Sequence, residues 1–520
     1  MDSELTEEEE IVLQGNDDTL DYKPKDLTIL SYQVEHYNRV CEILKTELAF
    51  LDVSKLGCGK GVHALAIALT FGMKLFICAP KTGIPKWKRE ARLYGAHIIN
   101  CITYNGLRGL SKSGITAHKF LRRKGDKFEA TDEFRKAAKE GLLIVFDECH
   151  FLKNDSDQLA AASCLAREAA RLAKAGANVR IAALSGTPAD KKENINSLFK
   201  LMGIILSDDL YTYNKSTRTY TLDGLQHVIN KCNRYDKDST FHITCRPVNK
   251  TTSKTICHEL YVNILKKHIS SSMNPPPLKV KCTMKNLFCD LPPEDLERMK
   301  KAVDLLSSAT SYDPKTEQVK YAGMDWSKIT ESRREIDSAK VNSFCRLTKR
   351  RLDADKNCKV LLFFTYKRDM YACADILAKY NPVVVNGDIS NSEKREAMIS
   401  KFQEYNNDCR VYISNPSVSG TSIDLDDTSP EGKHRRITYV APSYNFTPEY
   451  QATGRTLRKT TTSDAEVYFV YSSDMACEMN IINSMVTKSQ TARDMLNDNQ
   501  TDVVFPGELE EVYEKDLISE

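Results

Sequence analysis

The stretch SKLGCGKGVH, residues 54–63, has the residue types and spacing of a loop that binds phosphate. Gly57 and Gly59 would let the chain curl closely round an anion, with backbone N–H groups pointing at it. Lys60 would reach the β and γ oxygens of a nucleotide. The apolar pattern from Val62 onward predicts a helix after the loop, which favours a nucleotide site. A purely structural glycine-rich turn is the alternative.

One position in this loop departs from the usual pattern. The lysine of such a loop is normally followed by Ser or Thr, whose hydroxyl binds Mg²⁺ beside the phosphates. In this sequence Gly61 follows Lys60. Water can replace a hydroxyl in a magnesium shell. We therefore expect a working site, and the sequence leaves open whether Gly61 impairs it.

The second half of such a site would be the segment LLIVFDECH, residues 142–150. An apolar strand there would deliver two carboxylates to the carboxyl edge of a sheet, where α/β proteins bind ligands. Asp147 would hold Mg²⁺, and Glu148 would orient and deprotonate the water that attacks the γ-phosphate. A solvated acidic pair at the end of a strand is the alternative. The loop about 90 residues upstream and LSGTP at 184–188 favour the catalytic interpretation.

The elements that would position these residues alternate between strand and helix patterns, which predicts an α/β fold with parallel sheets. The first set, within 27–205, has apolar runs at 75–79, 142–146 and 181–184. A second set, within 341–490, has runs at 360–364, 383–385, 410–414, 436–441 and 467–471. We therefore expect two α/β lobes.

Three further segments complete the expected organisation. Residues 206–340 carry several prolines and many basic residues, without a clear alternation of strand and helix patterns. We interpret them as an insertion and linker. Within them, 291–306 has the proline, early acids and apolar spacing of a helix. The ends, 1–26 and 491–520, are acidic, which favours solvated tails.

The order of the motifs resembles that of superfamily 2 helicases, and their details are most similar to the SNF2 branch. In the first half the resemblance rests on Tyr32-Gln33, SKLGCGKG, ICAPKTGIPKWKREARLYG (77–95), ITYNGLR (102–108), DECHFLKN (147–154), SGTP and NSLFKLMGII (196–205). In the second half it rests on KVLLFFTY (359–366), NGDISNSEKREAMISKFQ (386–403), SVSGTSIDL (417–425) and APSYNFTPEYQATGRTLRK (441–459). It covers about residues 27–475, apart from the detail of 206–335.

This resemblance implies two RecA-like lobes that bind ATP and Mg²⁺ between them. It implies that Arg455 and Arg458 reach ATP from the second lobe, in a motif that begins at Gln451. The implied catalytic residues are Lys60, Glu148, Gln451, Arg455 and Arg458, and Asp147 is the implied metal ligand. The implied cofactor-binding residues are Gln33, Ser54, Gly57, Cys58, Gly59, Lys60, Gly61, Asp147 and Gly420. A solvated basic helix is the alternative for QATGRTLRK.

The resemblance also implies that nucleic acid is held by its phosphate backbone, so that contacts are independent of sequence. The candidate contacts in the family motifs are Lys81, Thr82, Thr103 and Tyr104 in the first lobe, and Thr365 and Ser419 in the second. The segment HKFLRRKGDKF, residues 118–128, adds Arg122, Arg123 and Lys124. A solvated surface loop is the alternative there.

The bulk composition is compatible with this interpretation. A chain of 520 residues implies two or three domains, and its net charge of +3 requires any nucleic-acid surface to arise from uneven charge. The 16 cysteines include no CxxC pair, which favours free thiols in a reducing intracellular compartment, the nucleus or cytoplasm. No signal-peptide pattern occurs, and the apolar stretch 62–80 contains His63 and Lys74, so we expect no membrane span.

The sequence thus predicts an ATP-dependent translocase or helicase that acts on nucleic acid, DNA in preference to RNA. The resemblance is compatible with a compact enzyme of the kind found in large DNA viruses. The alternative function is a nucleotide-binding or DNA-binding scaffold of the same fold that has lost hydrolysis, which the glycine at position 61 supports. An unrelated phosphate-loop kinase would not need the second-lobe motif.

Overall fold

The computed structural model divides into two compact units. The first comprises residues 1–276 and 490–503, and the second comprises 277–489 and 504–520. The residues described are 11–13, 25–108, 118–125, 127–214, 216–217, 219–309, 311–313, 318–320, 325–389, 392–419, 423–500 and 502–518.

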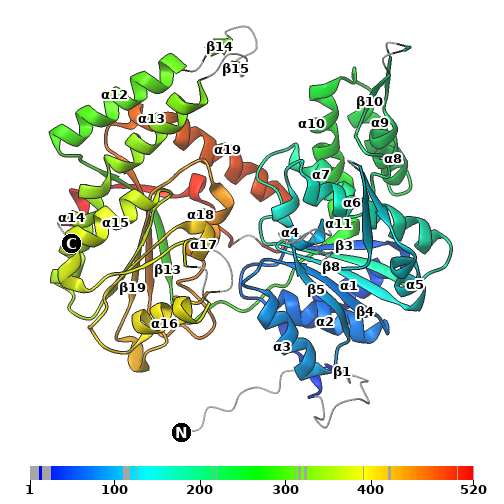
Figure 1. The fold of residues 1–520 in the computed structure, drawn as a ribbon, viewed down its shortest axis with the longest axis horizontal. Coiled ribbons are helices and arrows are strands. Elements are labelled where there is room, and N and C mark those ends of the chain that lie inside the picture. Colours follow the sequence, from blue (N-terminus) through cyan, green and yellow to red (C-terminus); the bar gives the residue numbers. More distant parts are fainter. Residues whose placement is uncertain are drawn as a thin grey trace. The chain divides into compact units, whose positions relative to one another are not determined.

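The first unit is built on a six-stranded sheet in which every neighbouring pair is parallel (Figure 1). Its strands, in spatial order, are β12 (Ser270–Ser271), β3 (Ala49–Asp52), β9 (Val179–Leu184), β8 (Leu142–Asp147), β4 (Lys74–Ala79) and β5 (Ile98–Thr103). Parallel strands must be joined by crossovers that return the chain to the same edge. The loops that follow β3, β8 and β9 therefore begin at one edge of the sheet.

Helices cover both faces of this sheet, because successive strand residues point to opposite sides. Leu143 and Val145 of β8 pack with α1 (Ser31–Thr46), α2 (Lys60–Thr70) and α3 (Ile84–Tyr94) in one apolar core. Ile144 and Phe146 pack in the other core, whose helices include α5 (Asp132–Glu140), α6 (Asp157–Lys174), α7 (Asn194–Leu201) and α10 (Lys250–Leu260). Both cores bury the central strands completely, which fixes the sheet register beneath the loops.

The remaining helices of the first unit are short or lie after α7. They are α4 (Tyr104–Leu107), α8 (Asp223–Cys232), α9 (Lys237–Thr244) and α11 (Lys266–Ile269). Three antiparallel hairpins complete this unit: β1 (Ile11–Leu13) with β2 (Leu27–Ile29), β6 (Leu121–Lys124) with β7 (Lys127–Ala130), and β10 (Thr212–Asn214) with β11 (Thr219–Thr221).

The second unit contains a seven-stranded sheet that is also parallel throughout. Its strands, in spatial order, are β17 (Val383–Val385), β18 (Val411–Ser414), β16 (Lys359–Phe363), β19 (Arg436–Val440), β20 (Ala465–Ser472), β13 (Cys282–Cys289) and β21 (Glu510–Tyr513). Its helices are α12 (Pro293–Ala309), α13 (Trp326–Ser338), α14 (Val341–Ala354), α15 (Lys367–Ile376), α16 (Ser392–Gln403), α17 (Pro416–Ser419), α18 (Phe446–Thr453) and most of α19 (Met479–Met495). The small hairpin of β14 (Ser311–Asp313) and β15 (Gln318–Lys320) lies between α12 and α13 in sequence.

The α/β class, the parallel sheets and all eight strands expected from apolar runs are confirmed. The helix expected at 291–306 is α12, and its first residue is Pro293. The sequence analysis missed β3 and β5, since AFLD is short and IINCIT is interrupted by Asn100.

The expected boundaries differ from the structure in three places. The tail expected at 1–26 includes β1, which pairs with β2. Residues 206–340 are not one linker: 206–276 belong to the first unit and 277–340 to the second. The cause is β13, which lies between β20 and β21 and buries Leu287 and Cys289 in the core of the second unit. Likewise, 491–520 is not a free tail, because it supplies β21 and the segment 490–503 of the first unit.

Two other expectations concern thiols and membranes. All 16 cysteines are free, and most of them are buried. Within the described parts of the chain, no helix is long and apolar enough to cross a membrane.

Candidate nucleotide site

The glycine-rich loop lies between β3 and α2, as the sequence predicts. Gly57 and Gly59 have φ angles of 83° and 89°, a region that residues with a side chain rarely adopt. A Cβ added at Gly59 would lie 2.8 Å from Gln33 Nε2. Both glycines are therefore required by backbone geometry, and the second also by the close approach of α1.

Gln33 holds the loop from the side of α1. Its Nε2 donates to the carbonyl oxygen of Cys58 at 2.9 Å, and its Oε1 accepts from the backbone N–H of Leu30 at 3.0 Å. Tyr32 also donates to the Cys58 carbonyl, at 3.3 Å. The Gln33 side chain is only 5% exposed, so its observed function is to fix the loop from behind.

Lys60 points into the loop that precedes it. Its Nζ donates to the carbonyl oxygens of Ser54 at 2.9 Å and Lys55 at 3.1 Å. An ammonium group has three donors, so these bonds hold the charged group at the centre of the loop and leave one donor over. Ser54 is fully buried, and its hydroxyl accepts from the backbone N–H of Met273 at 2.8 Å. Its side chain therefore supports the loop from beneath.

Asp147 ends β8 on the same row of the sheet as Asp52 of β3. Asp52 and Asp147 are both in register with Leu184 of β9, which lies between their strands. Neighbouring strands are about 4.8 Å apart, and β9 lies between β3 and β8. The loops after β3 and β8 therefore begin roughly 10 Å from each other. That distance allows one phosphate-bearing ligand to contact both the loop and the acidic pair.

Trp87 of α3 is a residue of this site that the sequence analysis did not identify. Its indole Nε1 donates to Asp147 Oδ2 at 2.7 Å, and the side chain is 3% exposed. Burial, followed by the charge of Glu148, raises the pKa of Asp147 to about 6, while the hydrogen bond from Trp87 and the charge of Lys60 oppose the rise. The only available signal was the position of a tryptophan in the segment 77–95, which resembles a family motif.

Gly61 lies against the same tryptophan. A Cβ at this position would be 3.6 Å from the indole ring of Trp87 and 3.5 Å from Glu90 Oε2, which are ordinary contacts. Trp87 therefore contacts both positions that the usual pattern would assign to Mg²⁺, the one after the lysine and the strand aspartate. Residue 61 itself offers no hydroxyl beside the indole.

Glu148 has a left-handed backbone, with φ 54° and ψ 52°, which is uncommon for a residue with a side chain. Such strain is characteristic of functional sites that are held by their surroundings. Its Oε2 is 3.3 Å from Nδ1 of His150, and that nitrogen is 3.0 Å from the hydroxyl of Ser185. His150 thus joins the acidic pair to the SGTP segment after β9.

Tyr104 supports the end of β8. Its hydroxyl donates to the carbonyl oxygen of Asp147 at 2.5 Å, and its ring stacks on Phe151. Because Tyr104 is only 7% exposed, its side chain positions Asp147, in contrast to the expected nucleic-acid contact. Phe151 is 49% exposed beside it.

The second-unit motif residues form a cluster of their own at and after the end of α18. Gln451 and Arg455 are buried, and the Arg455 carbonyl oxygen accepts from the backbone N–H of Leu425 at 3.0 Å. Arg458 Nε donates to Asp424 Oδ1 at 2.9 Å. The segments 417–425 and 441–459 are thereby joined. Gly420 lies outside the described residues.

The other expected nucleic-acid contacts have different degrees of exposure. Lys81 is exposed, whereas Thr82 and Thr365 are partly buried. Thr103 accepts from the backbone N–H of Gly106 at 3.1 Å and so begins α4. Ser419 is fully buried and its hydroxyl contacts Ser414 at 2.7 Å, so its side chain is not available to a nucleic acid in this structure.

The basic segment 118–128 lies largely in the β6–β7 hairpin, with Phe120 and Phe128 buried in the core, so the alternative of a surface loop does not describe it. Arg122 and Lys124 have side chains 70% and 77% exposed, and both approach Glu129, at 3.3 Å and 3.6 Å. Arg123 instead pairs with Asp157 at 3.1 Å and covers the ring of Phe128. Two of the three expected cations therefore project into solvent, and the third packs on the hairpin.

No protein-family model matches this sequence, and no curated protein matches it significantly. The assignment of a function therefore depends on the geometry of the site and on the order of its motifs.

The raised pKa of Asp147 can be tested through the tryptophan that contacts it. The chain has only two tryptophans, so Trp326→Phe leaves Trp87 as the single indole reporter. We expect Trp87 fluorescence to titrate with a midpoint near pH 6, because Asp147 is protonated below that pH and anionic above it. Glu148→Gln removes a charge that raises this pKa, so the midpoint should fall.

The control for this titration is Asp147→Asn in the same background, which should abolish the transition. Glu90, whose pKa is also raised by burial, lies close to the indole and is the competing source of such a signal. A midpoint unchanged by Asp147→Asn would show that Asp147 does not titrate there.

Proposed function

We propose that this protein is an ATP-driven translocase or helicase of the superfamily 2 type, with two RecA-like lobes, that tracks a nucleic-acid backbone, DNA in preference to RNA. The observation that carries the proposal is the common edge of the first sheet. There the loop with Lys60 follows β3 and the Asp147–Glu148 pair ends β8, in register across β9. The ordered motifs of both units support it.

The residues of the first unit have separable functions in this proposal. The loop would bind the phosphates of ATP through its backbone N–H groups, with Lys60 exchanging its loop carbonyls for phosphate oxygens. Mg²⁺, when bound, would neutralise charge that develops on the transferring phosphoryl group. Asp147 would hold that ion, with water at the position that Gly61 leaves open. Glu148 would accept the proton of the attacking water.

The arginines of the second unit have the chemistry that the reaction requires. A guanidinium group stays charged and binds phosphoryl oxygens in a planar, two-pronged geometry. In the resting arrangement Arg458 is paired with Asp424, so it would have to leave that carboxylate to act on ATP. The side chain of Asp424 is 70% exposed but that of Arg458 is 12% exposed, and Arg458 also donates to the carbonyl oxygen of Gly454, so the exchange would break a partly buried set of contacts.

One observation favours a second candidate, a nucleotide-binding scaffold without hydrolysis. Residue 61 lacks the hydroxyl that usually binds Mg²⁺, and Trp87 occupies part of the space beside Asp147. Against this candidate, Lys60, Asp147 and Glu148 are all retained, and the strained backbone of Glu148 has no other evident function. Activity measurements distinguish the two candidates.

The first test of hydrolysis is Glu148→Gln. The amide keeps the size of the side chain but cannot accept a proton from water, so we expect turnover to fall roughly 100-fold or more while ATP binding persists. Turnover of ATP should be measured without nucleic acid and with single strands, duplex DNA and RNA. A variant with the turnover of the wild type would remove Glu148 from this function.

The second test concerns Gly61→Thr. The added Cβ makes only ordinary contacts with Trp87 and Glu90, so the fold should accept it. The hydroxyl would restore a magnesium ligand in the first turn of α2, where threonine is no worse than glycine for the helix. We expect the Mg²⁺ concentration for half-maximal ATPase activity to fall.

Lys60→Ala is the control for that experiment and should abolish activity in both backgrounds. If the wild type binds no ATP and Gly61→Thr does not restore binding, the loop is a relic and the scaffold candidate is correct.

The third test concerns the exposed cations of the β6–β7 hairpin. Replacing Arg122 and Lys124 with Ala should weaken binding to all nucleic-acid sequences alike. Each lost phosphate contact should reduce the slope of log affinity against log salt by about 0.7 to 0.9. Arg123 is left in place because it packs on Phe128.

The matched control replaces Lys136 and Lys139 of α5, two exposed cations elsewhere on the same unit. It removes the same net charge and should leave the salt slope unchanged. Equal effects of both pairs would mean that general charge, and not the hairpin, determines binding.

A further inference from the structure

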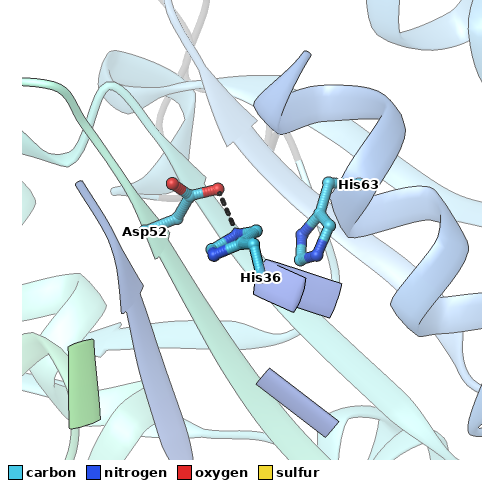
Figure 2. Close-up of side chains that lie close together, drawn as sticks. All are labelled: His36, Asp52 and His63. Carbon is cyan, nitrogen blue, oxygen red and sulfur yellow. Dashed lines mark hydrogen bonds and ion pairs between the residues drawn. The ribbon is translucent and has the colours of Figure 1, made fainter. Parts of the chain in front are cut away.

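A second cluster of chemically active side chains lies beneath the phosphate-binding loop. It contains His36 of α1, Asp52 at the end of β3 and His63 of α2, which are 2%, 0% and 2% exposed. One ligand atom from each of the three lies within 4.8 Å of the others. Figure 2 shows the ring of His36 between Asp52 and His63. Three elements of the first unit thus converge on one buried point.

His63 is the feature that hydrogen bonding does not explain. Both of its ring nitrogens are buried, and neither has a hydrogen-bond partner among the described residues. Buried polar groups are almost always satisfied, so an imidazole with two orphaned nitrogens requires a reason. Burial lowers the pKa of His63 well below its usual value, which keeps the ring neutral. A neutral imidazole is the form that binds metal ions.

The other two residues are already spaced as neighbouring ligands of one ion. His36 Nε2 lies 3.2 Å from Asp52 Oδ2. Bonds of about 2.0 Å from a tetrahedral Zn²⁺ separate neighbouring ligand atoms by about 3.3 Å. Asp52 also has a suitable charge. Burial acts to raise its carboxyl pKa, but the charge of His36 and its hydrogen bond hold that pKa below the usual range.

Supporting contacts orient both of these ligands. His36 Nδ1 is 2.8 Å from the hydroxyl of Ser271, and Asp52 Oδ1 accepts from the backbone N–H of Ser54 at 2.9 Å. Metal-binding histidines usually donate their second ring N–H to such a partner. When Nδ1 donates to Ser271 and a metal ion replaces the proton on Nε2, the Nε2 lone pair of His36 is directed at the point where Asp52 also presents an oxygen.

We propose that His36 Nε2, Asp52 Oδ2 and one ring nitrogen of His63 form a site for a single Zn²⁺ ion at the base of the loop. Two imidazoles and one carboxylate are a ligand set that zinc accepts, with water in the fourth position. Binding requires the His63 ring to rotate and move inward by roughly 1 Å, because zinc ligands lie closer together than the 4.8 Å limit seen here. The site is separate from the Mg²⁺ position assigned to Asp147, and it does not depend on the proposed function.

A bound Zn²⁺ ion would restrain the loop from beneath. The ion would join α1, which carries Gln33, to the strand before the loop and the helix after it. A ligand that binds only the folded state stabilises that state in proportion to the logarithm of its concentration. Zinc would therefore raise the unfolding temperature of the full-length protein.

The test uses full-length protein stripped with a chelator and then titrated with Zn²⁺ against a coloured competitor. The key variant is His63→Leu, which removes one ligand together with both unpaired nitrogens and fills a similar volume, so that it should fold. We expect the wild type to bind one more Zn²⁺ than this variant, or at least tenfold more tightly at one site. Zinc should raise the unfolding temperature of the wild type alone.

His97→Ala is the matched control, because His97 is exposed and should be irrelevant to the buried site. Co²⁺ provides a second reading on the unmodified protein: absorption bands of a site with nitrogen and oxygen ligands, without thiolate-to-metal charge transfer. That spectrum excludes capture by the 16 cysteines. Equal zinc binding by the wild type and His63→Leu, or a thiolate spectrum, would overturn the proposal.

Discussion

The parallel register of β3, β9 and β8 is the constraint on which the candidate site depends. Asp52, Leu184 and Asp147 lie on one row across the sheet, so the three following loops begin at the same level. A slip of one residue in β8 would turn Asp147 to the opposite face, away from α3. The register is held by strand residues that are buried on both faces, including Leu143 through Phe146. The packing of buried strand residues therefore determines which side chains lie together at the edge of the sheet.

The register of the sheet also determines which charged groups lie close to each strand end. Asp52 and Asp147 are in register, and both contact helices of the same face: Asp52 contacts His36 of α1, and Asp147 contacts Trp87 of α3. Burial acts to raise the carboxyl pKa of both, but the charge and hydrogen bond of His36 lower that of Asp52, whereas the charge of Glu148 adds to the rise at Asp147. Two aspartates in equivalent strand positions thus acquire different chemistry from their neighbours. One is suited to remain anionic beneath the loop, and the other titrates near neutral pH.

The sequence predicted the elements with strong apolar runs and the residues with motif spacing, and it failed where contacts are remote. It placed Lys60, Asp147 and Glu148 at one edge because parallel strands and glycine spacing are local patterns. It missed β13, whose polar sequence CTMKNLFC becomes a strand only because β20 and β21 pair with both of its edges. It also assigned Tyr104 and Ser419 to nucleic acid, whereas burial turns both hydroxyls to partners within the protein. Exposure depends on tertiary packing, which a motif does not encode.

Gly61 and Trp87 are best considered together. In the usual pattern a hydroxyl after the lysine faces the ion, and the strand aspartate faces it from the other side. Here the indole lies 3.6 Å from the position that a Cβ at residue 61 would take, and it donates its N–H to Asp147. The indole can orient the carboxylate but cannot bind a cation, since it offers only a donor. The orientation of Asp147 is consequently independent of any ion, whereas in the function proposed above the affinity for Mg²⁺ would have to come from one carboxylate, the phosphates and water.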